Sequence, residues 1–225
     1  MHHLIFATNN AHKVAEVRAV LGTAFSLETM REAGILMDIP EPHDTLEANA
    51  LEKAITIWKL TGKDCFSEDS GLEVNALDGE PGVYSARYAG ESRSDAANIE
   101  KLLSRLNEVG AHNGGHSGGK EAGSQNGGHA GSGGSADRSA RFRTVIALIL
   151  DGQEYLFEGV CPGHIIDSPR GSGGFGYDPV FIPDGSDQTF AEMSLEGKNV
   201  FSHRRKAMDQ LIQFLKKISH GQSKD

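Results

Sequence analysis

An uninterrupted apolar run in the second half of the chain is the feature that most constrains its fold. Residues Val145 to Leu150 read Val-Ile-Ala-Leu-Ile-Leu, so a strand over them is apolar on both faces. Such a strand must be covered on both sides, which is typical of a central strand in a sheet with helices on each face. The turn Asp151-Gly152 and the segment Tyr155 to Val160 follow at once, and this spacing predicts an antiparallel hairpin.

The rest of the chain alternates between short strand-like segments and amphipathic helical segments. Helices are expected where apolar residues recur three and four positions apart, over 13–21, 44–60, 94–109 and 202–218. Short strands are expected at 4–7, 65–66, 72–74 and 177–182. We predict that Asp44 and Glu47 form a capping box at the start of the second helix. Together with the hairpin, this order indicates the α/β class with a mixed sheet.

One segment departs from this pattern. From Gly110 to Ala136 the sequence is rich in Gly, Ser and His and contains no Leu, Ile, Val or aromatic residue. Nothing in it can be buried to offset the entropy cost of ordering, so we predict a flexible insertion at about 110–136 within a single domain over 1–225. His112, His116 and His129 lie in this segment, and incidental histidines in a solvated loop are favoured over a metal site.

Charge and cysteine content exclude several classes of protein. The net charge is −9, whereas general nucleic-acid binding needs a basic surface. The sequence contains no apolar run of about 18 residues, so no membrane partner is expected. Cys65 and Cys161 lack the spacing of metal ligands, and free thiols are typical of a reducing compartment. We therefore expect a cytoplasmic protein.

The segment from Ser172 to Pro179 is typical of a nucleotide-binding loop. Its glycines let the backbone approach a ligand closely, while Phe175 and Tyr177 offer flat faces for a base. Asp178 adds a hydrogen-bond acceptor. A glycine-rich loop that simply buries two aromatic rings is an equally good interpretation of this segment alone.

The segment Thr8-Asn9-Asn10-Ala11-His12-Lys13 suits a phosphate group. It lies where a strand gives way to a helix, and the first N–H groups of a helix have no internal partners. Asn9 or Asn10 can cap the helix, and Lys13 adds a positive charge. The alternative is an ordinary capped helix with a solvent-exposed lysine.

Carboxylates in two other segments suggest a metal site. Glu68 and Asp69 are adjacent after a short apolar strand, and like charges so close repel each other unless a cation neutralises them. Mg²⁺ prefers oxygen ligands, so Asp69, Glu68 and Glu41 are its candidate ligands. Ser70 can donate to a phosphate, and Gly71 permits a tight turn. A solvated acidic turn remains the alternative interpretation of Glu68 and Asp69, and the sequence alone favours an ordinary surface-loop acid at Glu41.

Cations elsewhere in the chain complement these carboxylates. Lys53 lies among apolar residues of the second helix and either reaches past them to solvent or points at a phosphate. Lys198, His203 and Arg204 precede or open the last helix, where positive charge opposes the helix dipole. Such local conflicts often mark functional residues, although a basic surface turn is the simpler interpretation.

Taken in order, these segments resemble the XTP/dITP pyrophosphatase family, also called the inosine triphosphatase family. The segments that carry the resemblance are Thr8 to Lys13, Thr45 to Ala50 with Lys53, Glu68 to Leu72, Pro81 to Tyr88, Gly173 to Pro179, Ala191 to Met193, Lys198, and Ser202 to Arg204. They cover nearly the whole chain outside the Gly-rich segment. Asn9 stands where many members have Gly, and Ala48 stands where many have Glu, which favours Glu41 as a metal ligand.

The resemblance implies a two-lobed α/β fold with an elongated mixed sheet, flanking helices, a cleft between the lobes, and a homodimer. It implies Mg²⁺-dependent hydrolysis of deaminated purine nucleoside triphosphates, ITP, dITP and XTP, to the monophosphate and pyrophosphate. Asp69 would be the catalytic carboxylate and a metal ligand. Substrate would be bound by Thr8 to Lys13, Ser70, Phe175 to Asp178, Lys198, His203 and Arg204. Two rivals stay open: a related enzyme for pyrimidine or modified nucleotides, and a nucleotide-binding regulator.

Overall fold

Six strands form one mixed sheet in the computed structural model, which describes residues 2–21, 25–113 and 137–221. Along the sheet the order is β2 (Ser26–Thr29), β1 (His3–Phe6), β3 (Cys65–Val74), β4 (Ser139–Leu150), β5 (Gln153–Ile165) and β6 (Phe181–Pro183). Strand β1 is parallel to both β2 and β3, whereas the pairs from β3 to β6 are antiparallel. The predicted α/β class and mixed sheet are confirmed.

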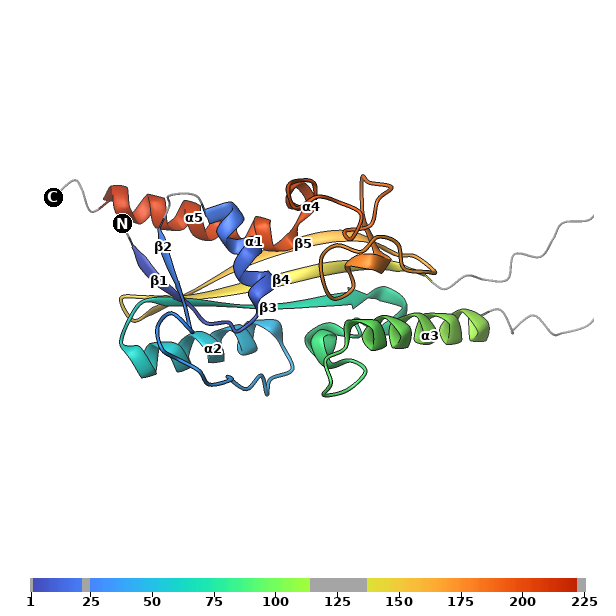
Figure 1. Ribbon diagram of the computed structural model, residues 1–225, viewed down its shortest axis with the longest axis horizontal. Coiled ribbons are helices and arrows are strands. Elements are labelled where there is room, and N and C mark those ends of the chain that lie inside the picture. The colour runs from blue at the N-terminus through green and yellow to red at the C-terminus, as the bar shows by residue number, and fades with distance from the viewer. Residues whose placement is uncertain (1, 22–24, 114–136, 222–225) are drawn as a thin grey trace, which may run out of the picture.

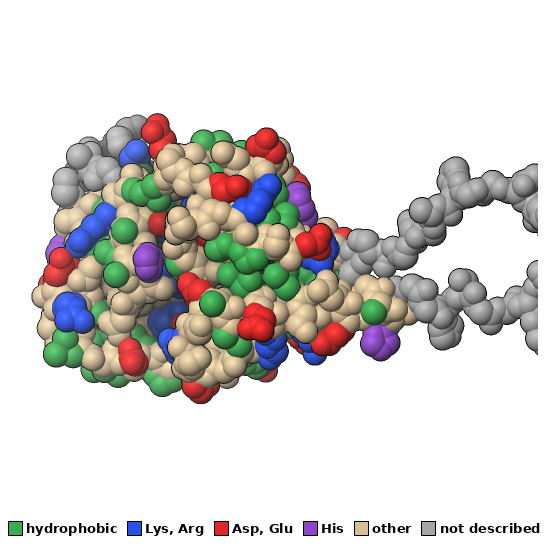
Figure 2. Space-filling view, turned by 45° about the vertical axis from the view of Figure 1, so that its right-hand side comes forward, with side chains coloured by type: hydrophobic (Ala, Val, Ile, Leu, Met, Phe, Trp, Pro, Cys, Tyr) green, Lys and Arg blue, Asp and Glu red, His purple; other side chains and the backbone are tan. Residues whose placement is uncertain are grey.

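Helices cover both faces of the sheet. Helices α1 (Ala11–Leu21), α4 (Leu195–Phe201) and α5 (His203–Gly221) lie on one side, and α2 (Leu46–Thr61) and α3 (Asp95–Asn113) lie on the other (Figure 1). No helix among the described residues is both long and apolar enough to span a bilayer. On the face in Figure 2, acidic and basic side chains are interspersed.

The apolar run of β4 is covered as its sequence requires. Ile146, Leu148 and Leu150 pack with residues of α1 and α5, while the alternate residues Val145, Ala147 and Ile149 pack with α2. Side chains alternate between the faces of a strand, so an apolar residue at every position serves both helical layers. The predicted hairpin from β4 to β5 is also confirmed, with Asp151 and Gly152 at φ 50° and 76° in its turn.

The long strands connect two lobes. One lobe contains the two hydrophobic clusters beside α1, α2 and α5, and the other contains a third cluster formed with α3, β6 and the far ends of β3, β4 and β5. Along β3, Phe66 belongs to the first lobe and Leu72 to the second. The residues between them are mostly polar, and they lie where the strand crosses from one lobe to the other.

Several predicted elements differ from those observed. Strand β3 is continuous, so Glu68 to Gly71 are strand residues and the predicted tight turn is wrong. Gly71 is needed because a Cβ there would lie 2.4 Å from the carbonyl oxygen of Gly82. The predicted strand 177–182 is instead a 3-10 turn, Asp178–Val180, followed by β6. Strand β2 and helix α4 were not predicted.

The capping box at the start of α2 was also wrong. The N-cap is Thr45, whose hydroxyl accepts a hydrogen bond from the amide of Ala48 at 3.2 Å. Glu47 instead forms an ion pair with Arg143 on the neighbouring strand β4. Helix α3 continues through Gly110 to Asn113, and the rest of the predicted insertion, 114–136, lies outside the described residues.

Candidate active site

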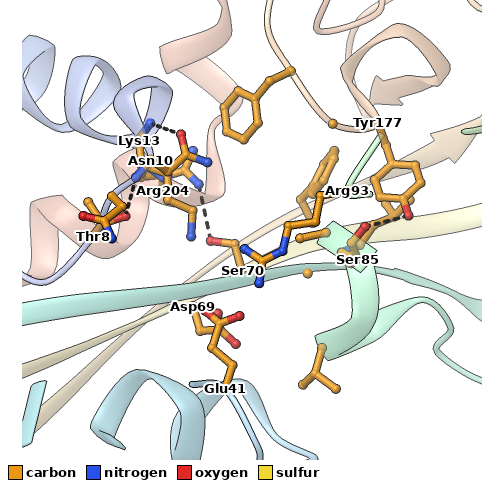
Figure 3. Close-up of a pocket in the computed structure, with 18 of the residues that line it drawn as sticks. Thr8, Asn10, Lys13, Glu41, Asp69, Ser70, Ser85, Arg93, Tyr177 and Arg204 are labelled. Carbon is orange, nitrogen blue, oxygen red and sulfur yellow. Dashed lines mark hydrogen bonds between the residues drawn. The ribbon is translucent and has the colours of Figure 1, made fainter. Parts of the chain in front are cut away.

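A cavity of about 430 Å³ opens between the lobes, as predicted, where the polar middle of β3 crosses from one to the other. Most of the predicted site residues line it, namely Thr8, Asn9, Asn10, Lys13, Glu41, Lys53, Asp69, Ser70, Phe175, Gly176, Tyr177, Asp178, Lys198, His203 and Arg204. Ala11, His12 and Glu68 do not form part of its wall. Figure 3 shows the labelled side chains around the middle of β3, with Thr8, Asn10, Lys13 and Arg204 on one side of the strand and Asp69 and Glu41 on the other.

The alternation of β3 separates the two adjacent carboxylates. Glu68 points toward α5, where it bonds with Arg204, whereas Asp69 points to the opposite face, where it bonds with Lys53 of α2. Successive strand residues face opposite sides of a sheet, so the two carboxylates do not share one cation. The structure gives no support to Glu68 as a metal ligand beside Asp69.

Glu68 is the centre of a buried ion network on the α5 side. The Nε atom of Arg204 donates to both oxygens of Glu68 at 2.9 and 2.8 Å, and Lys13 Nζ lies 3.2 Å from Glu68. Burial acts to raise the pKa of Glu68, but the charges of Arg204 and Lys13 outweigh it and lower that pKa to about 2. Glu68 is therefore ionised at neutral pH and holds these two cations in place.

A second pair of carboxylates lies on the α2 side of the cavity. Lys53 Nζ is 2.5 Å from Glu41 Oε1 and 2.9 Å from Asp69 Oδ1, so one ammonium group bridges both carboxylates. Arg87 fixes the loop that carries Glu41 by donating to its backbone carbonyl at 3.2 Å. Burial raises the pKa of Asp69 above its ordinary value, and the nearby lysines offset this only in part.

The segment from Thr8 to Lys13 forms the start of α1 as expected. Asn10 is the capping residue, and its side-chain oxygen accepts from the amides of His12 and Lys13 at 2.9 and 3.1 Å. The side chain of Asn9 donates to Asp38 at 2.8 Å, and its backbone is not in the positive-φ region. His12 stacks on Phe175 with ring centroids 5.3 Å apart.

In the glycine-rich loop, Ser172 to Pro179, some residues line the cavity and others hold the loop in place. Phe175 contributes a half-buried ring to the cavity, with Lys198 Nζ 5.2 Å from the ring centroid. Asp178 is buried, accepts from the amide of Phe175 at 3.0 Å and pairs with Lys198 at 2.7 Å. Gly174 has no room for a side chain, because a Cβ there would meet Asp178 at 2.0 Å. The hydroxyl of Tyr177 donates to the carbonyl of Ser85 in the other wall (Figure 3).

His203 is buried in the cavity wall and stacks on Phe142 with ring centroids 4.8 Å apart. Its Nδ1 atom has no hydrogen-bond partner among the described residues. Burial, followed by the charges of Arg204 and Lys198, holds the pKa of His203 well below its usual value. The ring is therefore neutral at pH 7, and its Nδ1 is a buried polar atom that the described residues leave unsatisfied.

Sequence reasoning missed several residues of the site. Glu16 of α1 is buried and pairs with both Lys198 and Arg204, but a single Glu in an amphipathic helix carries no signal. Asp95 accepts from the amide of Gly176 at 2.7 Å and closes the cavity on the α3 side. Arg93, Asp38 and Ser85 also line the cavity, and of these only Ser85 lies in a segment quoted for the family resemblance.

Comparisons with known proteins identify the family of the chain. The Ham1 family profile matches residues 4–117 and 116–214. A Porphyromonas gingivalis protein named dITP/XTP pyrophosphatase is 47% identical over 215 residues, which cover 96% of this chain and 98% of that protein. A Flavobacterium johnsoniae protein of the same name is 42% identical over 212 residues, covering 94% and 97%.

Solved structures share the fold. The Staphylococcus aureus Ham1 protein superposes with a TM-score of 0.76 at 37% identity, covering 95% of this chain and 98% of that one. A HAM1 protein from Coxiella burnetii gives a TM-score of 0.78 at 34% identity, covering 96% and 100%. The resemblance found in the sequence motifs is confirmed: this chain belongs to the Ham1 family.

Proposed function

We propose that this protein hydrolyses deaminated purine nucleoside triphosphates, ITP, dITP and XTP, to the nucleoside monophosphate and pyrophosphate. The observation that carries the proposal is a single cavity with two chemically different ends. The Phe175 ring, neutral His203 and buried Arg204 line it on the α5 side of β3, and the Glu41–Lys53–Asp69 cluster lines it on the α2 side. Relatives named dITP/XTP pyrophosphatase that are 42% and 47% identical over nearly the whole chain support it.

The aromatic end suits a purine base with a 6-oxo group. Hypoxanthine presents an O6 acceptor and an N1–H donor, whereas adenine reverses both. Arg204 binds Glu68, Glu16 and Ser70, and a guanidinium has five N–H donors, so some remain for O6. An adenine amino group at that position would leave buried donors unsatisfied, which typically costs about 1–3 kcal/mol each.

The acidic end fits Mg²⁺. Glu41 and Asp69 both direct an oxygen at the same ammonium group of Lys53, so a cation already lies between hard oxygen donors. No group of three or more His, Cys, Asp or Glu that could hold a metal occurs among the described residues. Mg²⁺ is commonly held by one or two carboxylates together with substrate phosphates. When bound there, Mg²⁺ would neutralise phosphate oxygens.

Asp69 is the better proton acceptor for the attacking water. A general base needs enough affinity for the proton, and burial raises the pKa of Asp69. Glu68 has a pKa of about 2 and both of its oxygens bonded to Arg204, so it is a weak base with no free oxygen toward the cavity. Thr8, Asn10 and Lys13 position phosphate oxygens at the start of α1, where backbone N–H groups and the helix dipole favour anions.

A pyrophosphate-release screen tests the proposed function. With Mg²⁺ present, ITP or XTP should exceed ATP in kcat/KM by at least about a hundredfold, and chromatography should show IMP rather than IDP as the product. A preference for pyrimidine or modified nucleotides, or IDP as the main product, would overturn the proposal. Binding without turnover would instead favour a regulator.

We further propose that the protein is a cytoplasmic homodimer. The two cysteines of the chain, Cys65 and Cys161, are both buried and free, which suits a reducing compartment. Trp58 and Leu60 at the end of α2 are 37% and 57% exposed, and exposed apolar residues are common at subunit interfaces. Light scattering coupled to gel filtration should give twice the chain mass of 24.1 kDa.

A further inference from the structure

Arg93 lines the same cavity, but the chemistry above gives it no role. It belongs to the loop between the 3-10 helix Gly82–Arg87 and helix α3, where its amide donates to the carbonyl of Gly90 at 3.3 Å. Its φ of 50° lies in the left-handed region, which is uncommon for residues other than glycine. A residue held in a sparsely populated conformation is often retained for function.

The side chain of Arg93 points into the cavity, toward the side that holds Glu41 and Asp69 (Figure 3). Its charge is among those that act on Glu41, behind burial and the nearer charge of Lys53. The residue itself is solvent-exposed. Among the described residues, no hydrogen bond or ion pair engages its guanidinium group.

The other cations around the cavity are already paired. Lys13 pairs with Glu68, Lys53 with Glu41 and Asp69, Lys198 with Glu16 and Asp178, and Arg204 with Glu16 and Glu68. A triphosphate adds several negative charges to this space, and its chemistry depends mainly on positioning and charge neutralisation. Arg93 is therefore a cation of the cavity wall that a phosphate can recruit without breaking an existing ion pair.

We propose that Arg93 is a substrate-binding residue whose guanidinium donates to the β- and γ-phosphate oxygens, the part of the substrate that leaves as pyrophosphate. The proposal rests on the proposed function. It assigns Arg93 to this part because its side chain points toward the Glu41 side (Figure 3). Arg204 bonds with Glu68 on the opposite face of β3 from Asp69 and lies against the Phe175 ring, where we place the base. A planar, bidentate donor suits neighbouring phosphate oxygens better than an ammonium group does.

Steady-state kinetics with three substitutions test this assignment. Arg93→Gln should raise KM for ITP about tenfold or more, the effect of losing a charge-assisted hydrogen bond, and Arg93→Lys should recover part of the loss. Product inhibition separates the two ends of the substrate: in Arg93→Gln, inhibition by pyrophosphate should weaken about tenfold while inhibition by IMP stays unchanged. Arg31→Gln, which removes an exposed arginine outside the cavity wall, should match wild type.

Arg93→Gly separates binding from folding. Glycine adopts a φ of 50° freely, so this variant should melt no lower than wild type and still show the raised KM. The proposal is overturned if KM and pyrophosphate inhibition are unchanged in Arg93→Gln, or if inhibition by IMP weakens equally.

A binding measurement without turnover distinguishes failure of the Arg93 assignment from failure of the proposed function. If the wild-type protein cleaves no nucleoside triphosphate, the proposed function is wrong, but phosphate binding by Arg93 is not yet decided. Titration calorimetry with inorganic tripolyphosphate and Mg²⁺ then tests Arg93 without turnover: an affinity at least about tenfold lower in Arg93→Gln upholds phosphate binding, and equal affinities overturn it.

Discussion

At the scale of the residue, Asp69 combines a raised pKa with a position facing Lys53 and Glu41. We predict that Asp69→Asn abolishes hydrolysis, because the amide is nearly isosteric but can neither accept the proton nor carry the charge that would hold a metal. Activity of the purified variant should fall below about a tenth of wild type, a loss of more than about 1.4 kcal/mol of transition-state stabilisation. An unchanged circular dichroism spectrum is the control, and activity above that level would exclude Asp69 as the catalytic carboxylate.

Glu68 contributes to the free energy of unfolding, and this contribution depends on pH. Its folded-state pKa of about 2 lies below the ordinary 4.5, so the stability it provides is fully present above about pH 4.5 and lost as pH falls toward 2. The shift corresponds to about 3 kcal/mol at most. We predict that Glu68→Gln is destabilised at pH 7, where Arg204 and Lys13 lose their partner, and that its deficit shrinks at pH 3.

Urea unfolding at the two pH values measures this difference. Glu91→Gln, at an exposed position, is the matched control. Its free energy of unfolding should equal that of wild type at both pH values. If Glu68→Gln and wild type lose stability in parallel between pH 5 and 3, the buried ion network is not the source of the dependence.

At the scale of the element, β3 shows which parts of a strand can be predicted from the sequence and which cannot. Its apolar ends were predicted as strands, but the polar middle was predicted as a turn because burial of polar residues depends on partners that are distant in sequence. Those partners are Arg204 and Lys53. Glu16 and Arg93 could not be predicted for the same reason. A single Glu in the amphipathic helix α1 carries no signal, and Arg93 lies in a loop without a periodic pattern. The N-cap of α2 was misplaced by one residue, from Thr45 to Asp44, because both residue types are good caps.

Gly71 gives β3 a specific test. The strand approaches Gly82 so closely that a Cβ at Gly71 would lie 2.4 Å from its carbonyl oxygen. We predict that Gly71→Ala destabilises the protein by roughly 1–3 kcal/mol, since the contact involves backbone that must shift. Gly197→Ala is the control, because a Cβ there meets nothing closer than 3.4 Å. Equal urea midpoints for the two variants would contradict the close approach.

At the scale of the whole molecule, the sheet is what assembles a site from residues far apart in sequence. Strands β3, β4 and β5 pass through both lobes, so the segments from Thr8 to Arg204 meet around one cavity. The sequence predicted which segments contribute, through their motifs, and 15 of the predicted residues line the cavity. The pairing of each cation with its carboxylate depends on the three-dimensional arrangement and could not be predicted.

Removing most of the Gly-rich segment would test whether the two lobes fold and act without it. Helix α3 ends at Asn113 and β4 begins at Ser139, and both pack into the hydrophobic cluster of the second lobe through Leu102, Leu106 and Phe142. Residues 114–136 contain no Leu, Ile, Val or aromatic side chain that could add to this cluster. Shortening a loop lowers its closure entropy only slightly, by about 0.6 kcal/mol per halving of length.

We therefore predict that replacing residues 114–136 by about five Gly and Ser residues leaves kcat/KM for ITP and the melting temperature close to wild type, because the segment has no apolar side chain to add to the core and a shorter loop changes the closure entropy only slightly. A ten-residue replacement controls for strain caused by the shorter connection. Loss of activity in both replacements, with an unchanged melting temperature, would mean that the segment reaches the active site or a partner subunit. The histidines His116 and His129 would then have to be tested individually as ligands of a metal or of the substrate.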